Sequence, residues 1–117
     1  MKINFFEYNK LYLEHKKKYL EIFDSVCKRG AFILQKDLEN FEKSLSKFLN
    51  IKYTLGINDG TNALILGLMA NDIGYGDEVI IPSHTYIATA AAVKLVGARP
   101  IFADINKKDN LICIKSI

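Results

Sequence analysis

The stretch EVIIPSHTYIATAAAVKLVGARPIFA (residues 78–103) predicts a β-strand, an α-helix and a second β-strand. Its two ends, EVII (78–81) and PIFA (100–103), are apolar without polar alternation, which is typical of strands buried on both faces. The Ala-rich residues Thr85–Val96 between them predict a helix that Gly97 ends. Because a helix that joins two such strands favours a parallel pair, the fold class predicted is α/β.

The residues before this stretch continue the same pattern. YTLGI (53–57) predicts another strand, and Asn58–Thr61 predicts a turn with helix-capping residues. Asn62–Ala70 predicts a helix, and Gly74–Asp77 predicts the turn that leads into EVII. Strands and helices therefore alternate with short links from residue 53 onward.

The first part of the chain predicts two helices. One covers about Leu11–Lys28 and ends at Gly30, and the other covers about Asp37–Leu49. Their apolar stripes consist of Tyr19, Ile22, Phe23, Val26 and Cys27 in the first helix, and of Leu38, Phe41, Leu45, Phe48 and Leu49 in the second. We therefore divide the chain into an N-terminal helical segment, residues 1–50, and an α/β part, residues 51–117.

The α/β pattern supplies few elements for a complete domain. Three strands and at most four helices give little material to cover both faces of a sheet. After Asp104 the chain turns polar, and it ends in LICIKSI (111–117) without a further helix–strand unit. We therefore expect an incomplete α/β domain that belongs to a larger protein.

Composition excludes several classes of function. No run of about 18 apolar residues predicts a membrane helix, and MKINFFEYNK (1–10) lacks the features of a secretory signal. The net charge is only +3, and the cluster Lys16–Lys18 lies on a predicted helix without interleaved aromatic residues, so we expect no nucleic-acid partner. Cys27 and Cys113 show no metal-ligand spacing. We expect a cytoplasmic protein with reduced thiols and no metal site.

The segment INDGTNALILGL (57–68) is the first candidate for chemistry. In this segment a predicted strand ends in a turn, and a predicted helix begins immediately after the turn. The first N–H groups of a helix lack intrahelical partners and attract anions such as phosphate. Gly60 lets a ligand approach the backbone, and Thr61 and Asn62 add side-chain donors. The alternative is an ordinary capped turn between a strand and a helix.

The segment PSHTYIAT (82–89) is the second candidate. In a parallel arrangement it opens on the same edge of the sheet as the Gly60 turn. Tyr86 is placed to stack on a flat ring whose phosphate rests at Thr61. The alternative is that Tyr86 packs in the core and Thr85 caps the helix. His84 is a candidate acid–base group by its residue type, and the alternative for it is an exposed loop residue.

Four motifs in register resemble the DegT/StrS family of pyridoxal-phosphate (PLP) sugar aminotransferases. They are GAFILQKDLENFE (30–42), NDGTNAL (58–64), GDEVIIPSHTYIATA (76–90) and GARPIFADI (97–105). The resemblance implies the start of the large domain of a fold type I PLP enzyme, with a sheet flanked by helices. It also implies site residues: Gly60, Thr61 and Asn62 hold the PLP phosphate, Tyr86 stacks on the ring, and Phe32 and Ile33 contact substrate.

The same resemblance implies what this chain does not supply. Such an enzyme needs a lysine that attaches to the cofactor and a carboxylate against the pyridine nitrogen. Both are expected beyond Ile117, so we assign no catalytic residue here and expect the 117-residue chain alone to be inactive; Lys94 is expected on a solvated helix surface. The parent enzyme is expected to be a homodimer that moves an amino group from glutamate to a nucleotide-linked keto-deoxysugar, in deoxyamino sugar and polysaccharide biosynthesis.

Three alternatives stay open at this stage. A PLP-dependent sugar dehydratase carries histidine in place of the lysine, and no residue in this sequence distinguishes it from an aminotransferase. A non-catalytic truncated product or interaction remnant would explain the abrupt end after the last strand. A dinucleotide-binding Rossmann domain is disfavoured because the turn lacks the G-x-G-x-x-G spacing.

Overall fold

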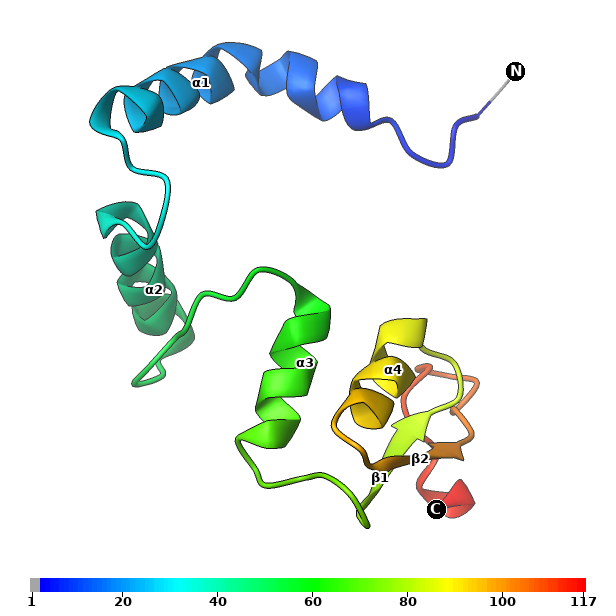
Figure 1. Cartoon of the computed structure of the whole chain (residues 1–117). Helices are drawn as coiled ribbons and strands as arrows, with labels where there is room; N and C mark the ends of the chain where they lie inside the picture. Colours follow the sequence, from blue (N-terminus) through cyan, green and yellow to red (C-terminus); the bar gives the residue numbers. More distant parts are fainter. Residues whose placement is uncertain (1–2) are drawn as a thin grey trace. The chain divides into compact units, whose positions relative to one another are not determined.

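The computed structural model describes residues 3–117, which form two compact units that meet in the chain between Gly56 and Ile57 (Figure 1). The first unit contains α1 (Tyr8–Arg29) and α2 (Lys36–Leu49). The second contains α3 (Gly60–Met69), β1 (Glu78–Pro82), α4 (Ile87–Leu95), β2 (Arg99–Ala103) and the 3₁₀ helix η1 (Ile114–Ser116). The predicted division at residues 50/51 stays a prediction.

The two helices of the first unit end as their sequences predict. Gly30 closes α1 in the left-handed conformation, with φ of 62°, and its N–H donates to the carbonyl of Cys27. Asn50 ends α2 in the same way, with φ of 53°. Glycine and asparagine tolerate this conformation better than other residues, so each suits the end of a helix.

The strand–helix–strand prediction for residues 78–103 is confirmed. β1 and β2 pair in parallel, with Glu78 opposite Arg99 and Ile81 opposite Phe102. α4 is the crossover between them and packs against both strands. Gly97 follows α4 with φ of 90°, and a Cβ there would meet the backbone N of Tyr75 at 3.4 Å, so this turn requires glycine.

A small apolar core lies between the sheet and α4. Ile81, Val93 and Ala98 form it, and the partly buried side chains packed around it are those of Leu68, Ile73, Val79, Ala90 and Val96. Side chains alternate along each strand, so Ile80 points to the face opposite Ile81, and both Ile80 and Phe102 are exposed. Among residues 3–117 both strands therefore carry exposed apolar side chains, where the sequence predicts strands buried on both faces.

The predicted strand at residues 53–57 is wrong for this structure. No strand of the described chain pairs with these residues, and the Thr54 hydroxyl and the Gly56 N–H bond to α2 instead. An apolar run that favours a strand becomes one only where a neighbour supplies the ladder of hydrogen bonds. An isolated antiparallel bridge between Ile105 and Ile112, which the sequence does not predict, follows β2.

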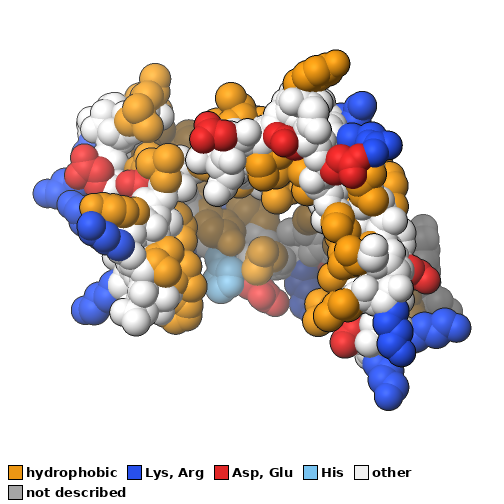
Figure 2. All heavy atoms as spheres, turned by 90° about the horizontal axis from the view of Figure 1, so that it is seen from below, with side chains coloured by type: hydrophobic (Ala, Val, Ile, Leu, Met, Phe, Trp, Pro, Cys, Tyr) orange, Lys and Arg blue, Asp and Glu red, His pale blue; other side chains and the backbone are white. Residues whose placement is uncertain are grey.

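Many apolar side chains stay on the surface. α1 has no buried residue, and its predicted stripe is only half-buried at Val26 and Cys27. Figure 2 shows apolar side chains, in orange, across much of the visible surface. Among residues 3–117 no helix is both long and apolar enough to cross a membrane.

The alternation in β1 gives a matched test of the core. Ile81 is 4% exposed and Ile80 is 45% exposed. Ile81→Ala in the 117-residue chain is expected to lower the free energy of unfolding by about 2 kcal/mol, because it leaves a cavity in the core. Ile80→Ala is expected to cost less than about 1 kcal/mol. Urea denaturation of both variants measures the difference, and equal losses would contradict the described core.

Candidate functional site

The amino-terminal ends of α3 and α4 lie at the end of the sheet toward which β1 points. Figure 1 shows both helices starting on this side, and α3 packs against α4. The turn before α3 and the loop after β1 therefore open on one edge, as the sequence predicts for residues 58–62 and 82–86. Parallel α/β sheets bind ligands at this carboxyl edge, where helix N-termini concentrate N–H donors.

Asp59 organises the turn before α3. Its Oδ1 accepts the backbone N–H of Asn62 at 2.8 Å, which makes it the N-cap of the helix. Its Oδ2 accepts the side-chain amides of Asn58 at 2.7 Å and Asn62 at 3.0 Å. The bond from the Asn62 backbone N–H is the main reason why the pKa of Asp59 lies below its ordinary value.

Gly60 and Thr61 form the part of the turn that a ligand can reach. Nothing lies within 4 Å of the point that a Cβ on Gly60 would occupy, so the backbone is open on that side. Thr61 is half-buried in the first turn of α3. The hydroxyl of Thr61 thus belongs to the helix start, where backbone N–H groups lack intrahelical partners.

The sequence predicts that Asn62 donates hydrogen bonds to a phosphate, but in this structure Asn62 bonds to Asp59. Both its backbone N–H and its side-chain amide already donate to Asp59. A phosphate that bonds to the backbone N–H of Asn62 would have to replace Asp59 as its acceptor. The contribution of Asn62 to an anion site stays a prediction.

Tyr86 does not pack in the core. It is the N-cap of α4, without a side-chain capping bond, and its side chain is 77% exposed. Thr85 does not cap the helix, and its hydroxyl instead lies 2.9 Å from that of Thr89. The alternative explanation of this segment is therefore wrong on both points, and the ring of Tyr86 is free to stack on a flat ligand.

Phe32 and Ile33 lie in the link between α1 and α2, in the unit that ends at Gly56. Both side chains are exposed. Leu34, next to them, has φ of 44°, a conformation that is uncommon for a residue with a branched side chain. Substrate contact by Phe32 and Ile33 stays a prediction.

The residues of the turn fit the phosphate of PLP. The open backbone at Gly60, the hydroxyl of Thr61 and the exposed ring of Tyr86 lie in the same unit, at helix starts on one edge of the sheet. The negative carboxylate of Asp59 repels an anion, but it already accepts hydrogen bonds from the side-chain amides of Asn58 and Asn62. The chain thus offers donors for an anion and an aromatic face for a ring.

A comparison with protein families decides the relationship. The model of the DegT/DnrJ/EryC1/StrS aminotransferase family matches residues 14–117. The chain belongs to this family. The family's match covers both units, including α2, the turn before α3 and the strand–helix–strand region, so the resemblance drawn from the four sequence motifs is confirmed.

Two curated relatives and one solved structure illustrate the family. The dTDP-3-amino-3,6-dideoxy-alpha-D-galactopyranose transaminase of Aneurinibacillus thermoaerophilus is 36% identical over 102 residues, 87% of this chain and 28% of that protein. The 3-oxo-glucose-6-phosphate:glutamate aminotransferase of Bacillus subtilis is 40% identical over 87 residues, 74% of this chain and 20% of that protein. The chain thus spans less than a third of either relative's length.

The solved structure is NtdA from Bacillus subtilis with its bound cofactor PMP, pyridoxamine phosphate. It superposes with a TM-score of 0.84 at 36% sequence identity and covers 89% of this chain and 24% of that chain. The predicted fold class is therefore confirmed: helices and a parallel sheet of the kind found in fold type I PLP enzymes of this family.

The sequence identifies this turn but misses the network around Asp59. The spacing Asp-x-x-Asn before an apolar run is the signal that would have found it, because an N-cap side chain bonds to the third residue of the helix. Glu42 and Ser46, which bond to residues 54–56, carry no such local signal because their partners are 8 to 14 residues away.

The lowered pKa of Asp59 gives a pH prediction. Since the folded pKa lies below the unfolded one, the cap stabilises α3 above about pH 4, and this contribution is lost as the pH falls through the folded pKa. Asp59→Asn keeps a capping side chain without the charge, so its α3 should lose less stability in acid. NMR titration of the Asp59 carboxyl carbon in the 117-residue chain measures the shift, and an ordinary carboxyl pKa would contradict the described cap.

Proposed function

We propose that the whole protein is a PLP-dependent sugar aminotransferase, and that this chain supplies the first half of its cofactor site. The observation that carries the proposal is the family match over residues 14–117, which includes the open helix start at Gly60. When bound, PLP supplies the electron sink for moving an amino group between carbon atoms. Gly60 and Thr61 bind its phosphate, and Tyr86 orients its ring by stacking.

The remaining parts of the site lie outside the described residues in this proposal. A lysine that attaches to the cofactor and a carboxylate for the pyridine nitrogen come from residues after Ile117. The N-terminal link with Phe32 and Ile33 contributes to the substrate entrance. Residues 51–117 begin the cofactor-binding domain, residues 1–50 form a helical segment before it, and the whole enzyme is a cytoplasmic homodimer.

The names of the relatives support the substrate class. The relative from A. thermoaerophilus is named for a dTDP-linked amino sugar, and the one from B. subtilis is named for glutamate as a reactant. We therefore propose a nucleotide-linked keto-deoxysugar as the amino acceptor and glutamate as the donor. Family membership alone would not carry a substrate, because one fold supports many reactions.

The reaction is tested on the full-length protein with PLP, glutamate and a panel of dTDP- and UDP-linked keto sugars. The expected result is formation of 2-oxoglutarate together with an amino sugar, in equal amounts. A deoxygenated sugar without transfer of nitrogen would assign the protein as a dehydratase instead. No turnover of any sugar, and no binding of PLP, would contradict the proposal.

The roles of Thr61 and Tyr86 are tested by the affinity of the full-length protein for PMP, which binds without a covalent bond to the protein. Thr61→Ala and Tyr86→Ala are each expected to raise the Kd by about tenfold, since each removes one contact to the phosphate or the ring. Tyr75→Ala is the control, because Tyr75 is 98% exposed in the turn at the opposite end of β1. Equal effects of Tyr86→Ala and Tyr75→Ala would refute the stacking role.

A further inference from the structure

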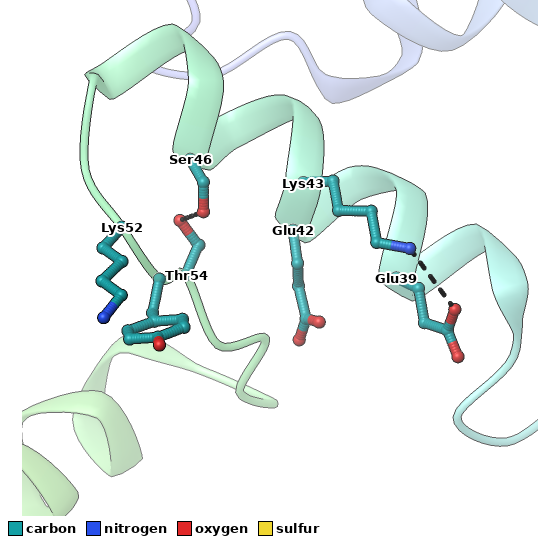
Figure 3. Close-up of a pocket in the computed structure, with 7 residues that line it drawn as sticks. Glu39, Glu42, Lys43, Ser46, Lys52 and Thr54 are labelled. Atoms are coloured by element: carbon teal, nitrogen blue, oxygen red, sulfur yellow. Dashed lines mark hydrogen bonds and ion pairs between the residues drawn. The ribbon is translucent and has the colours of Figure 1, made fainter.

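Two side chains of α2 hold the segment that leads to the turn at Gly60. The backbone N–H of Gly56 donates to Oε1 of Glu42 at 2.7 Å, and the hydroxyl of Ser46 donates to that of Thr54 at 2.7 Å. Both bonds are partly buried. Figure 3 shows Glu42 and Ser46 one turn apart on α2, with Ser46 joined to Thr54.

Gly56 fits this arrangement because it has no side chain. A Cβ at this position would lie 2.5 Å from Cδ1 of Leu38 and 3.3 Å from Oε1 of Glu42. Any larger residue would displace Leu38 and push the carboxylate of Glu42 away from the N–H. The close approach of residues 54–56 to α2 therefore depends on three residues: Leu38, Glu42 and Gly56.

The bond from Glu42 replaces a bond that a strand would make. Thr54 and Gly56 face α2 and are half-buried, while Tyr53 and Leu55 alternate outward and are exposed. An N–H in such an extended segment normally donates to a neighbouring strand. A bond to a carboxylate is stronger than one to a neutral acceptor, so Glu42 holds Gly56 firmly without a strand partner.

The concavity next to these bonds is not itself a ligand site. It encloses about 430 Å³, and its lining includes Lys43 and Lys52 (Figure 3). Lys43 pairs with Glu39 at 3.9 Å, and Lys52 lies over the ring of Tyr53 at 5.0 Å from its centroid. The polar groups that face this concavity are thus already partnered within the first unit.

We infer that Glu42 is a positioning residue for the phosphate of the cofactor. This inference rests on the proposed function. Gly56 is four residues before Gly60, so a bond that fixes Gly56 limits the conformations open to the turn that follows. Glu42 does not touch the cofactor; it acts through the Gly56 N–H and prepares the backbone donors of the turn for an anion.

The test is the binding of PMP and of pyridoxamine, which lacks the phosphate, to the full-length protein. Glu42→Ala is expected to raise the Kd for PMP by about tenfold, because the free energy transmitted through Gly56 does not exceed that of about one hydrogen bond. It is expected to change the Kd for pyridoxamine by less than about twofold, because the ring contacts are unaffected. Glu42→Gln keeps an acceptor and is expected to restore most of the PMP affinity. Glu39→Ala, on the same helix, is the matched control and is expected to leave both affinities unchanged.

Each outcome decides between the possibilities. Equal losses for PMP and pyridoxamine in Glu42→Ala, or no loss for either, would overturn the positioning role. Absence of PMP binding by the unaltered protein would overturn the proposed function and the positioning role together. If Glu42→Ala does not fold, Glu42→Asp tests the same point, since its carboxylate is one methylene too short to reach the Gly56 N–H. Faster hydrogen exchange at the Gly56 amide in that variant is the second expected result, and unchanged exchange would overturn the inference.

Discussion

The parallel pairing of β1 with β2 determines where the helix starts of the second unit lie. Two parallel strands need a crossover, and α4 supplies it and packs back onto the same pair. This connection places the start of α4 at the carboxyl end of β1. Because α3 packs on α4 and starts on the same side, the unpaired N–H groups of two helices collect at one edge of the sheet (Figure 1). A cofactor that carries a phosphate and a flat ring fits this combination, and family membership agrees with it.

The chemistry of this edge depends on a balance of charge. Asp59 caps α3 and lowers its own pKa by accepting the Asn62 N–H, so a carboxylate stands beside the donors that an anion would use. This carboxylate accepts hydrogen bonds from the side-chain amides of Asn58 and Asn62. No atom lies close to the point that a Cβ on Gly60 would occupy, so the backbone there stays open. The cap therefore holds the conformation of the turn in the absence of a ligand, so a phosphate in the proposed enzyme would bind donors that are already in place. Preorganised donors bind at lower entropic cost.

In this chain the sequence predicts the positions of helices and strands better than the contacts between them. The 3.6-residue periodicity and the helix ends at Gly30 and Asn50 depend only on neighbouring residues. The bounds of α1 and α2 are therefore predicted to within a few residues. The apolar runs of β1 and β2 are equally local. The strand predicted at residues 53–57 is wrong because pairing depends on a neighbour that the run itself does not reveal. At the candidate site, the pattern predicts Gly60, Thr61 and Tyr86 as cofactor contacts, and the exposure of Tyr86 removes the core-packing alternative. The bond between Glu42 and Gly56 joins residues that are 14 positions apart in the sequence. It depends on tertiary contact, so no local sequence pattern predicts it.

The most direct measurement is a crystal structure of the full-length protein with PMP bound. We expect the phosphate within about 3 Å of the Gly60 or Thr61 backbone N–H and the Thr61 hydroxyl, with the ring of Tyr86 stacked on the pyridine. We also expect Gly56 to remain bonded to Glu42. A phosphate bound away from the start of α3, with Tyr86 turned from the ring, would contradict the assignment of this edge as the cofactor site.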